Sequence, residues 1–83
     1  MSEQNRIVVL GILVSELDSV ESVNRILHDY GGYVLGRMGL PLRDRGVNAI
    51  TLVLDAPVDV VNALTGKLGS IGGVSAKALF GKA

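Results

Sequence analysis

The sequence predicts an α+β fold in which two helices cover one face of a four-stranded antiparallel sheet. Strand-like and helix-like segments alternate in the order β-α-β-β-α-β over 83 residues, the length of one small domain, residues 1–83. The segments richest in Val, Ile and Leu are the first and third strands, and right-handed crossovers place those strands at the centre of such a sheet. The compact arrangement with these properties is the ferredoxin-like βαββαβ sandwich, with strand order 4-1-3-2.

The first part of the chain predicts a central strand and an amphipathic helix. Residues 7–14, IVVLGILV, are apolar at nearly every position and rich in β-branched side chains, as is typical of a central strand. After the turn SELD, Asp18 and Glu21 form a capping-box pattern that predicts the start of a helix. Gly31 and Gly32 are expected to end it as a glycine C-cap. The apolar stripe of this helix consists of Val20, Val23, Ile26, Leu27 and Tyr30.

The second part predicts two strands, a helix and a final strand. Residues 33–40, YVLGRMGL, form a weaker strand whose Gly36 and Gly39 favour an edge or bulged position. The charged segment PLRDRG connects it to residues 47–55, VNAITLVLD, the second strong strand. Pro57 suits the first position of the next helix. The apolar stripe of that helix is Val60, Val61, Leu64 and Leu68, and residues 73–80, GVSAKALF, form the last strand.

The glycine-rich segment LTGKLGSIGGV, residues 64–74, invites comparison with a phosphate-binding loop. A Walker loop needs glycine five residues before its Gly-Lys pair and Ser or Thr after it, but Val61 and Leu68 occupy these positions. The segment also falls late in a helix, away from the positive end of the helix dipole. We therefore interpret Gly69 as a C-cap, SIGG as a turn, and Lys67 as a partner of the last helical carbonyl groups.

Charge and composition exclude several classes of function. Eight Lys and Arg balance eight Asp and Glu, so no net charge attracts nucleic acid or an anionic membrane. The sequence has no cysteine, which removes disulfides and thiolate ligands. His28, the only histidine, has no second His or Cys to complete a metal site and no serine in an elbow motif. We therefore expect no catalytic residue, no metal site and no cofactor.

Sequence signals for export or membrane insertion are also missing. The start, MSEQNR, lacks the basic region and cleavage site of a signal peptide. The longest apolar run, residues 7–14, is far shorter than the roughly 20 residues that span a bilayer. The expectation is a cytoplasmic protein that binds neither a membrane nor, directly, nucleic acid.

The two strongest strands are more apolar than a half-covered sheet requires. In a sheet covered on one face only, each strand should alternate apolar and polar residues, and these strands do not. A bare apolar face is rare in monomers, so we predict a homo-oligomer, a dimer or tetramer, formed through the helix-free face. The sequence does not fix which residues occupy which face. The residues assigned to the interface are Val8, Leu10, Ile12, Ile50 and Leu52.

Several stretches resemble a known family. VNRILHDY, GRMGLP and the run from ITLVLD through GKLGSIGGVSAK are similar to small stand-alone proteins called iron-only hydrogenase system regulators. The resemblance extends from Ile7 to Lys77, and NALTGKLGSIGGV is its most specific part. In layout, the chain also resembles ACT-like regulatory domains, including the ligand-binding half of nickel-responsive repressors. The resemblance implies an ACT-like, ferredoxin-like fold and a regulatory role connected with hydrogenase maturation.

The chain departs from the nickel repressors in two respects. Those repressors use His and Cys ligands, whereas this sequence has one His and no Cys. They also carry a ribbon-helix-helix arm that binds DNA, and only MSEQN and Arg6 precede the first strand here. Nickel sensing and direct operator binding are therefore not expected. If the protein regulates transcription, we expect it to act through a partner.

The resemblance to ACT domains also implies a position for a ligand. ACT domains bind a small molecule, often an amino acid, at a subunit interface near the first strand-helix turn. By position this turn is Ser15, Glu16, Leu17 and Asp18, and Arg37 on the second strand is the candidate partner of an anion. Free N–H groups at the helix start could hold a carboxylate, although Glu16 and Asp18 would repel it. A plain capped turn and an exposed edge-strand arginine are the alternative.

Three functions follow, in order of preference. The first is a homo-oligomeric regulatory module that binds a small-molecule effector or a protein partner. The second is an assembly protein without a ligand. The third is a small acylphosphatase-like hydrolase, which needs a basic, glycine-rich loop where this chain has the acidic SELD; we therefore do not expect an enzyme.

Overall fold

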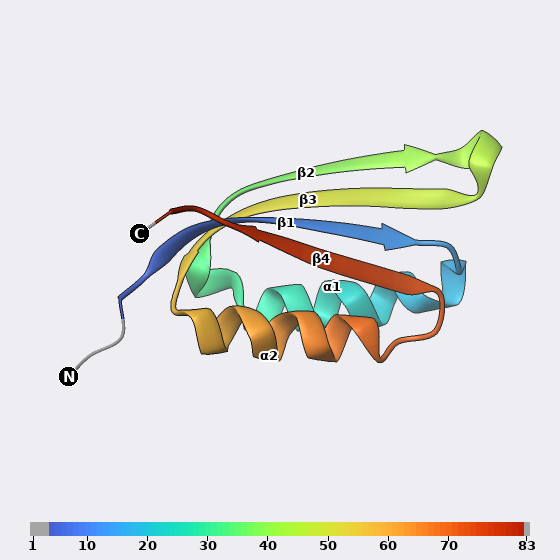
Figure 1. Cartoon of the computed structure of the whole chain (residues 1–83). Coiled ribbons are helices and arrows are strands. Elements are labelled where there is room, and N and C mark those ends of the chain that lie inside the picture. Colours follow the sequence, from blue (N-terminus) through green and yellow to red (C-terminus); the bar gives the residue numbers. More distant parts are fainter. Residues whose placement is uncertain (1–3, 83) are drawn as a thin grey trace.

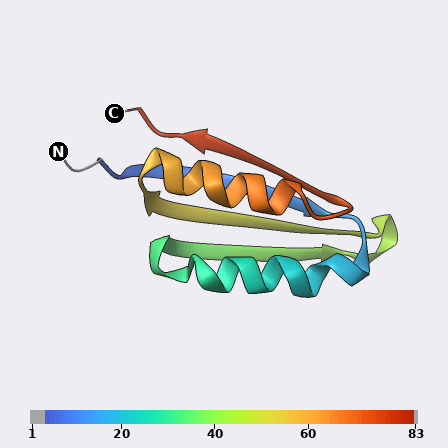
Figure 2. The same cartoon turned by 90° about the horizontal axis from the view of Figure 1, so that it is seen from below.

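The computed structural model describes residues 4–82 and contains the predicted α+β arrangement. The elements are β1 (Arg6–Val14), α1 (Val20–Asp29), β2 (Val34–Leu42), β3 (Val47–Ala56), α2 (Val58–Gly69) and β4 (Val74–Phe80). The strands form one antiparallel sheet in the order β2-β3-β1-β4, which is the predicted order 4-1-3-2 taken from the other edge. Both helices lie on the same side of the sheet (Figures 1 and 2). This arrangement is consistent with a ferredoxin-like fold.

The core lies between the helices and one face of the two central strands. The buried apolar side chains are Val8, Leu10, Ile12, Val14, Ile50, Leu52, Leu54 and Ala56 from the sheet, and Val23, Leu27, Val61, Leu64 and Leu68 from the helices. Every second residue of β1 and β3 contributes, because side chains alternate between the two faces of a strand. The two strands are in register, with Leu10 opposite Leu52.

The residues assigned from sequence to the oligomer interface all belong to this core. Val8, Leu10, Ile12, Ile50 and Leu52 are at most 6% exposed and face the helices. The choice of face was therefore wrong, because both alternating sets of β1 are apolar and either could have been the inner one. The prediction that the helix-free face forms an interface then concerns the other set of residues.

The helix ends differ in detail from the capping prediction. A 3₁₀ turn, Leu17–Ser19, precedes α1, so Ser19 rather than Asp18 is the N-cap residue. The Ser19 hydroxyl donates to the Gly72 carbonyl at 2.6 Å instead of capping the helix. At the other end, Tyr30 is the C-cap, and Gly31 belongs to the 3₁₀ turn Gly31–Tyr33. Gly31 follows the C-cap directly, but among residues 4–82 only Gly46 and Gly73 have a positive φ, so the left-handed glycine cap does not form at the end of α1.

The two ends of the second helix also differ by one residue from the positions predicted from the sequence. Pro57 is the N-cap of α2 rather than its first residue, and Ser70 rather than Gly69 is the C-cap. A left-handed backbone occurs four residues after Gly69, at Gly73, where φ is 75°. The helix end and the turn into β4 are therefore separate features of the chain, joined by the short segment that starts at Ser70.

Strand β2 is an edge strand with a bulge, as its glycines predict. Its pairing with β3 shifts register between Val34 and Gly36. The strand continues to Leu42, beyond the predicted end at Leu40, and the 3₁₀ turn Arg43–Arg45 joins it to β3. Gly46, with φ of 66°, provides the left-handed residue that closes this turn. Over residues 4–82, neither helix has the length and apolar character needed to cross a membrane.

Candidate functional site

The helix-free face of the sheet, called the open face below, is largely apolar. It carries the residues that alternate with the core residues, since directly paired residues of antiparallel strands point to the same side. Large apolar side chains on this face are 38–71% exposed: Ile7, Val9, Leu13, Met38, Leu40, Leu42 and Leu79. The charged side chains that share it are Asp55, opposite Ile7, and Lys77, opposite Gly11. An exposed cluster of this kind is typical of an interaction surface.

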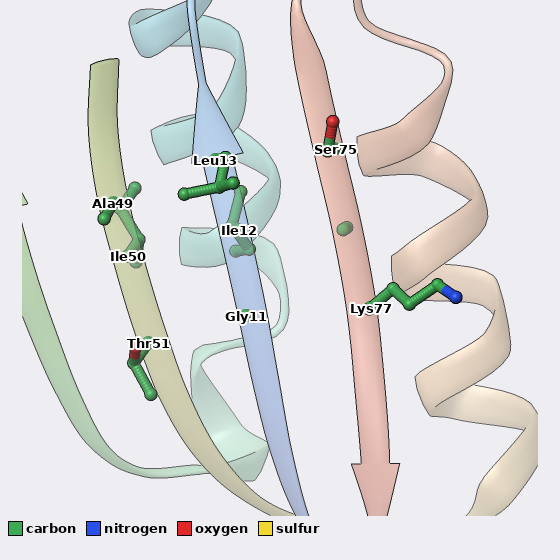
Figure 3. Close-up of a pocket in the computed structure, with 9 residues that line it drawn as sticks. Gly11, Ile12, Leu13, Ala49, Ile50, Thr51, Ser75 and Lys77 are labelled. Atoms are coloured by element: carbon green, nitrogen blue, oxygen red, sulfur yellow. The ribbon is translucent and has the colours of Figure 1, made fainter. Parts of the chain in front are cut away.

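A hollow of about 290 Å³ lies at the middle of the open face. Gly11 is at its floor, between Thr51 on β3 and Lys77 on β4 (Figure 3). Leu13 stands beside the hollow, and the Lys77 side chain extends away from Gly11. A Cβ atom added to Gly11 would meet only the Lys77 carbonyl oxygen, at 4.0 Å. The packing of the described chain therefore does not itself require glycine at this position.

The predicted ligand-binding turn is joined to the glycine-rich loop before β4. The Ser15 backbone N–H and hydroxyl both donate to the Gly73 carbonyl, at 2.8 and 3.1 Å. The Ser19 hydroxyl donates to the neighbouring Gly72 carbonyl. The Glu16 side chain packs so closely that a Cβ atom on Gly73 would lie 2.6 Å from its Cγ. The glycine-rich loop thus provides acceptors for this turn, and its role in the monomer is structural.

We expect Gly73→Ala to destabilise the protein by about 1–2 kcal/mol, because an alanine in the left-handed conformation is strained and its methyl group would displace Glu16. Gly69→Ala is the matched control, since a Cβ atom there meets nothing within 4 Å and the residue is helical; this change should be neutral or stabilising. Urea unfolding followed by circular dichroism measures both. Equal midpoints for Gly73→Ala and the unmodified protein would contradict this account of the loop.

Arg37 does not join the other predicted ligand-binding residues. It lies on the helix side of β2, where its Nη2 donates to Asn24 Oδ1 on α1 at 2.8 Å. The remaining candidates, Ser15, Glu16, Leu17 and Asp18, lie in the turn beside Gly72 and Gly73. Leu17 points outward and is 85% exposed. The predicted ligand-binding residues therefore lie at two separate sites, Arg37 beside α1 and the other four in the turn before α1. Ligand binding at either site stays a prediction.

A groove lies between α1 and β2 on both sides of the Arg37–Asn24 hydrogen bond. It consists of two hollows of about 430 and 240 Å³, which share Arg37 and Asn24 as lining residues. His28 lines the larger hollow, and Asn48 and Gly39 line the smaller one. Neither lining includes an Asp or Glu. The groove thus offers a guanidinium group, two amides and an imidazole to a ligand, a combination that favours an anion.

Lys67, from the glycine-rich segment, contacts the other helix rather than the helical carbonyl groups. Its Nζ lies 5.1 Å from the centroid of the Tyr30 ring, at the end of α1. Hydrogen bonding to the Tyr30 side chain raises the pKa of Lys67 above its ordinary value. The contact joins the two helices on the side of the molecule away from the open face.

Chemistry-bearing side chains are sparse in the part of the chain that the structure describes. Among residues 4–82, no three His, Asp or Glu side chains gather as metal ligands. The one ion pair within that range joins Arg25 to Glu21 at 3.8 Å on the exposed side of α1. Hollows with room for a ligand lie on the open face, in the α1–β2 groove, and, at about 290 Å³, beside Leu17 and the turn before β3; the lining of this last hollow is Val14, Leu17, Arg43, Gly46, Val47 and Asn48.

Sequence reasoning missed the residues of the open face, although one signal pointed to them. In β4, Ser75 and Lys77 alternate with Val74 and Ala76. Because Lys77 pairs with Gly11, the polar residues of β4 show which residues of β1 face away from the helices: those on the same side as Gly11. The register needed for this step is not visible in the sequence of β1 alone.

Comparisons with known proteins identify similar chains. A family model described as "TM1266-like: Iron-only hydrogenase system regulator, putative" matches residues 6–78. A solved structure described as uncharacterized protein TM1266 from Thermotoga maritima is 36% identical, with a TM-score of 0.91. The match covers 95% of this chain and 100% of that one. A search of curated proteins gave no match.

Proposed function

Because this chain belongs to the TM1266-like family of iron-only hydrogenase system regulators, we propose that it is a regulatory binding module that associates with a second copy of itself through the open face. The exposed apolar open face carries this proposal. Its large apolar side chains are 38–71% exposed, and contiguous apolar patches larger than a few hundred Å² are rare on monomers. Burying the open face contributes several kcal/mol to association, at about 25 cal/mol per Å², before the entropic costs are subtracted.

The charge of the open face favours a second copy over a charged partner. Asp55 and Lys77 are its charged residues, and they cancel. A neutral apolar surface gives no advantage to a nucleic acid or to a strongly charged protein. A standard interface buries about 800 Å² on each partner.

The effector of the proposed module is a small anion held in the α1–β2 groove, of which an amino acid carboxylate is one example. Arg37 supports this assignment, because Asn24 holds its guanidinium group at the boundary of the two hollows. An Arg–carboxylate contact is a charge-assisted hydrogen bond and is stronger than a neutral one. The groove lies on the helix side of β2, so an effector there leaves the open face free for the second copy.

Native mass spectrometry of protein purified gently from its own cells tests both halves of the proposal. We expect a homo-oligomer, dimer or tetramer, that carries an extra small mass, and we expect Arg37→Ala to lose that mass but remain oligomeric. An oligomer without added mass would overturn the effector and leave an assembly protein. A monomer at every concentration tested would overturn the oligomer.

A further inference from the structure

Large and small residues of the open face are arranged in a pattern that a second copy can match. Three successive rows of directly paired residues cross the face. In the order β2, β3, β1, β4 they are Leu40–Ala49–Leu13–Ser75, Met38–Thr51–Gly11–Lys77 and Gly36–Val53–Val9–Leu79. A midline between β3 and β1 divides each row into two halves. Within each row, the residue on β2 is compared with the residue on β4, and the residue on β3 with the residue on β1. Most of these pairs differ in size, and the exceptions are Val53 with Val9 and Met38 with Lys77.

The outer positions show the pattern most clearly. In the first row Leu40 on β2 corresponds to Ser75 on β4, and in the third row Gly36 on β2 corresponds to Leu79 on β4. The sense of the size difference is therefore reversed between the two rows. This reversal means that neither edge of the face is uniformly raised, and each edge carries both a projection and a depression.

We infer that the second copy packs on the open face about a twofold axis that runs parallel to the strands, between β1 and β3. This inference rests on the proposed self-association and names its geometry. Rotation about such an axis keeps every residue in its own row and exchanges β2 with β4 and β3 with β1. Each β1 therefore covers the partner's β3, in an aligned sandwich with sheets about 10 Å apart and strands inclined by about 30°.

In this dimer, large side chains meet small ones along the first and third rows. Leu79 fills the depression at the partner's Gly36, and Leu40 lies over the partner's Ser75. Near the axis, Leu13 packs over the partner's Ala49. Facing positions in these two rows then have similar summed volumes, which is the condition for two sheets to pack at constant separation without voids.

The glycines of the face support this arrangement. A Cβ atom at Gly36 would meet nothing within 4 Å, and one at Gly11 would meet only a carbonyl oxygen at 4.0 Å. Neither glycine has the positive φ that excludes other residues. Contacts within residues 4–82 thus do not require glycine at these two positions. In the dimer, the facing Leu79 and Thr51 side chains occupy the space that side chains at these positions would take.

An axis across the strands fits the face less well. Placed between the first and second rows, it sets Leu40 against the partner's Met38 and Ala49 against the partner's Thr51, so that only the two pairs on β1 and β4 contrast in size. An axis through the second row places Lys77 opposite the partner's Lys77, and the repulsion between these like charges is unfavourable. With the axis along the strands, Lys77 faces the partner's Met38, and its aliphatic stem packs while the ammonium group reaches solvent.

A size exchange tests the geometry. Gly36→Leu and Leu79→Ala should each raise the dimer dissociation constant by about tenfold or more, through overpacking and a cavity respectively. The double variant should restore it to within about threefold of the unmodified protein, because the new leucine fills the space that the new alanine leaves. Sedimentation equilibrium measures association, and circular dichroism shows that each variant is folded.

The mismatched pair Gly36→Leu with Leu40→Ser is the control, since these positions do not face each other, and it should show no recovery. A second test uses the absence of cysteine from the sequence. The first double-cysteine variant, Gly36→Cys with Leu79→Cys, places thiols on opposite edges of one sheet, so a short bismaleimide should join two copies rather than one chain. The second double-cysteine variant, Gly36→Cys with Leu42→Cys, should not be joined.

The outcomes separate this inference from the proposed function. A monomeric unmodified protein would overturn the self-association and the geometry together. A dimer that Leu79→Ala weakens but that the size exchange does not restore would overturn the axis along the strands and leave an open-face dimer. Efficient crosslinking of the second double-cysteine variant in place of the first would likewise place the axis across the strands. Recovery in the exchange, with crosslinking of the first double-cysteine variant, would support the geometry.

Discussion

Replacing Leu10 by aspartate is expected to leave the chain unfolded. Leu10 is 0% exposed and lies between Leu52 on β3 and Ala78 on β4. Losing a buried leucine costs about 2–5 kcal/mol, and burying a carboxylate without a partner costs several more. Domains of this size have a total stability near the lower end of about 5–15 kcal/mol. Circular dichroism of the purified variant should lack the signal of the sheet and helices.

Leu10→Ala is the control for this variant, because it creates a cavity at the same position without adding a charge. It should remain folded with a lower urea midpoint, which shows that the aspartate acts through desolvation. A Leu10→Asp protein that unfolds at the same urea concentration as the unmodified chain would contradict the placement of this side chain beneath the helices. Leu52→Asp, at the paired position of β3, should behave in the same way.

Replacing Leu13 by aspartate is expected to separate the oligomer into folded monomers. Leu13 lies on the same strand as Leu10, but on the open face, where it is 52% exposed. A charge there costs the monomer little, within about 1 kcal/mol. In the dimer it becomes a desolvated carboxylate, which should raise the dissociation constant by about a hundredfold or more.

Sedimentation equilibrium measures the dissociation constant, and urea unfolding measures the stability of the separated chains. Leu17→Asp is the matched control, since the same substitution is made at a residue that is 85% exposed and lies off the sheet; it should leave association unchanged. If Leu13→Asp associates as tightly as the unmodified protein, the open face is not the interface.

The order of the elements was predictable because the central strands differ strongly from the others in composition. The apolar runs at residues 7–14 and 47–55 are typical of central strands, and a crossover topology puts such strands at the centre. The edge position and bulge of β2 also follow from its glycines. These features depend on local sequence and on topology, both of which a single chain reveals.

The orientation of the central strands was not predictable in the same way. Val8 and Leu10 are no more apolar than Val9 and Leu13, so hydrophobicity alone does not decide which pair faces the helices. The decision comes from pairing with β4, whose Lys77 cannot be buried. Register between strands far apart in the sequence is a tertiary property, and a one-residue difference exchanges the two faces.

The candidate ligand-binding residues were only partly predictable for a related reason. Ser15 was a candidate because of its place in the turn before the helix, but its hydroxyl group donates to the Gly73 carbonyl, and that of the nearby Ser19 donates to the Gly72 carbonyl. Such a contact joins segments that are distant in the sequence and has no local signature. Arg37 was predicted as the candidate partner of an anion, but its position beside Asn24 depends on how α1 lies over β2.

The neighbours of β1 determine when the sheet can be completed during synthesis. This strand pairs with β3 and with β4, and its contact between Val8 and Phe80 spans most of the chain. While the polypeptide is being made, β1 therefore has an unpaired edge until the last of the strands emerges. Contacts between distant segments slow folding, and an unpaired apolar strand invites addition of foreign strands. The side of β1 that β4 later covers is accordingly the edge that stays unpaired longest, and a truncation before Val74 would leave it unpaired permanently.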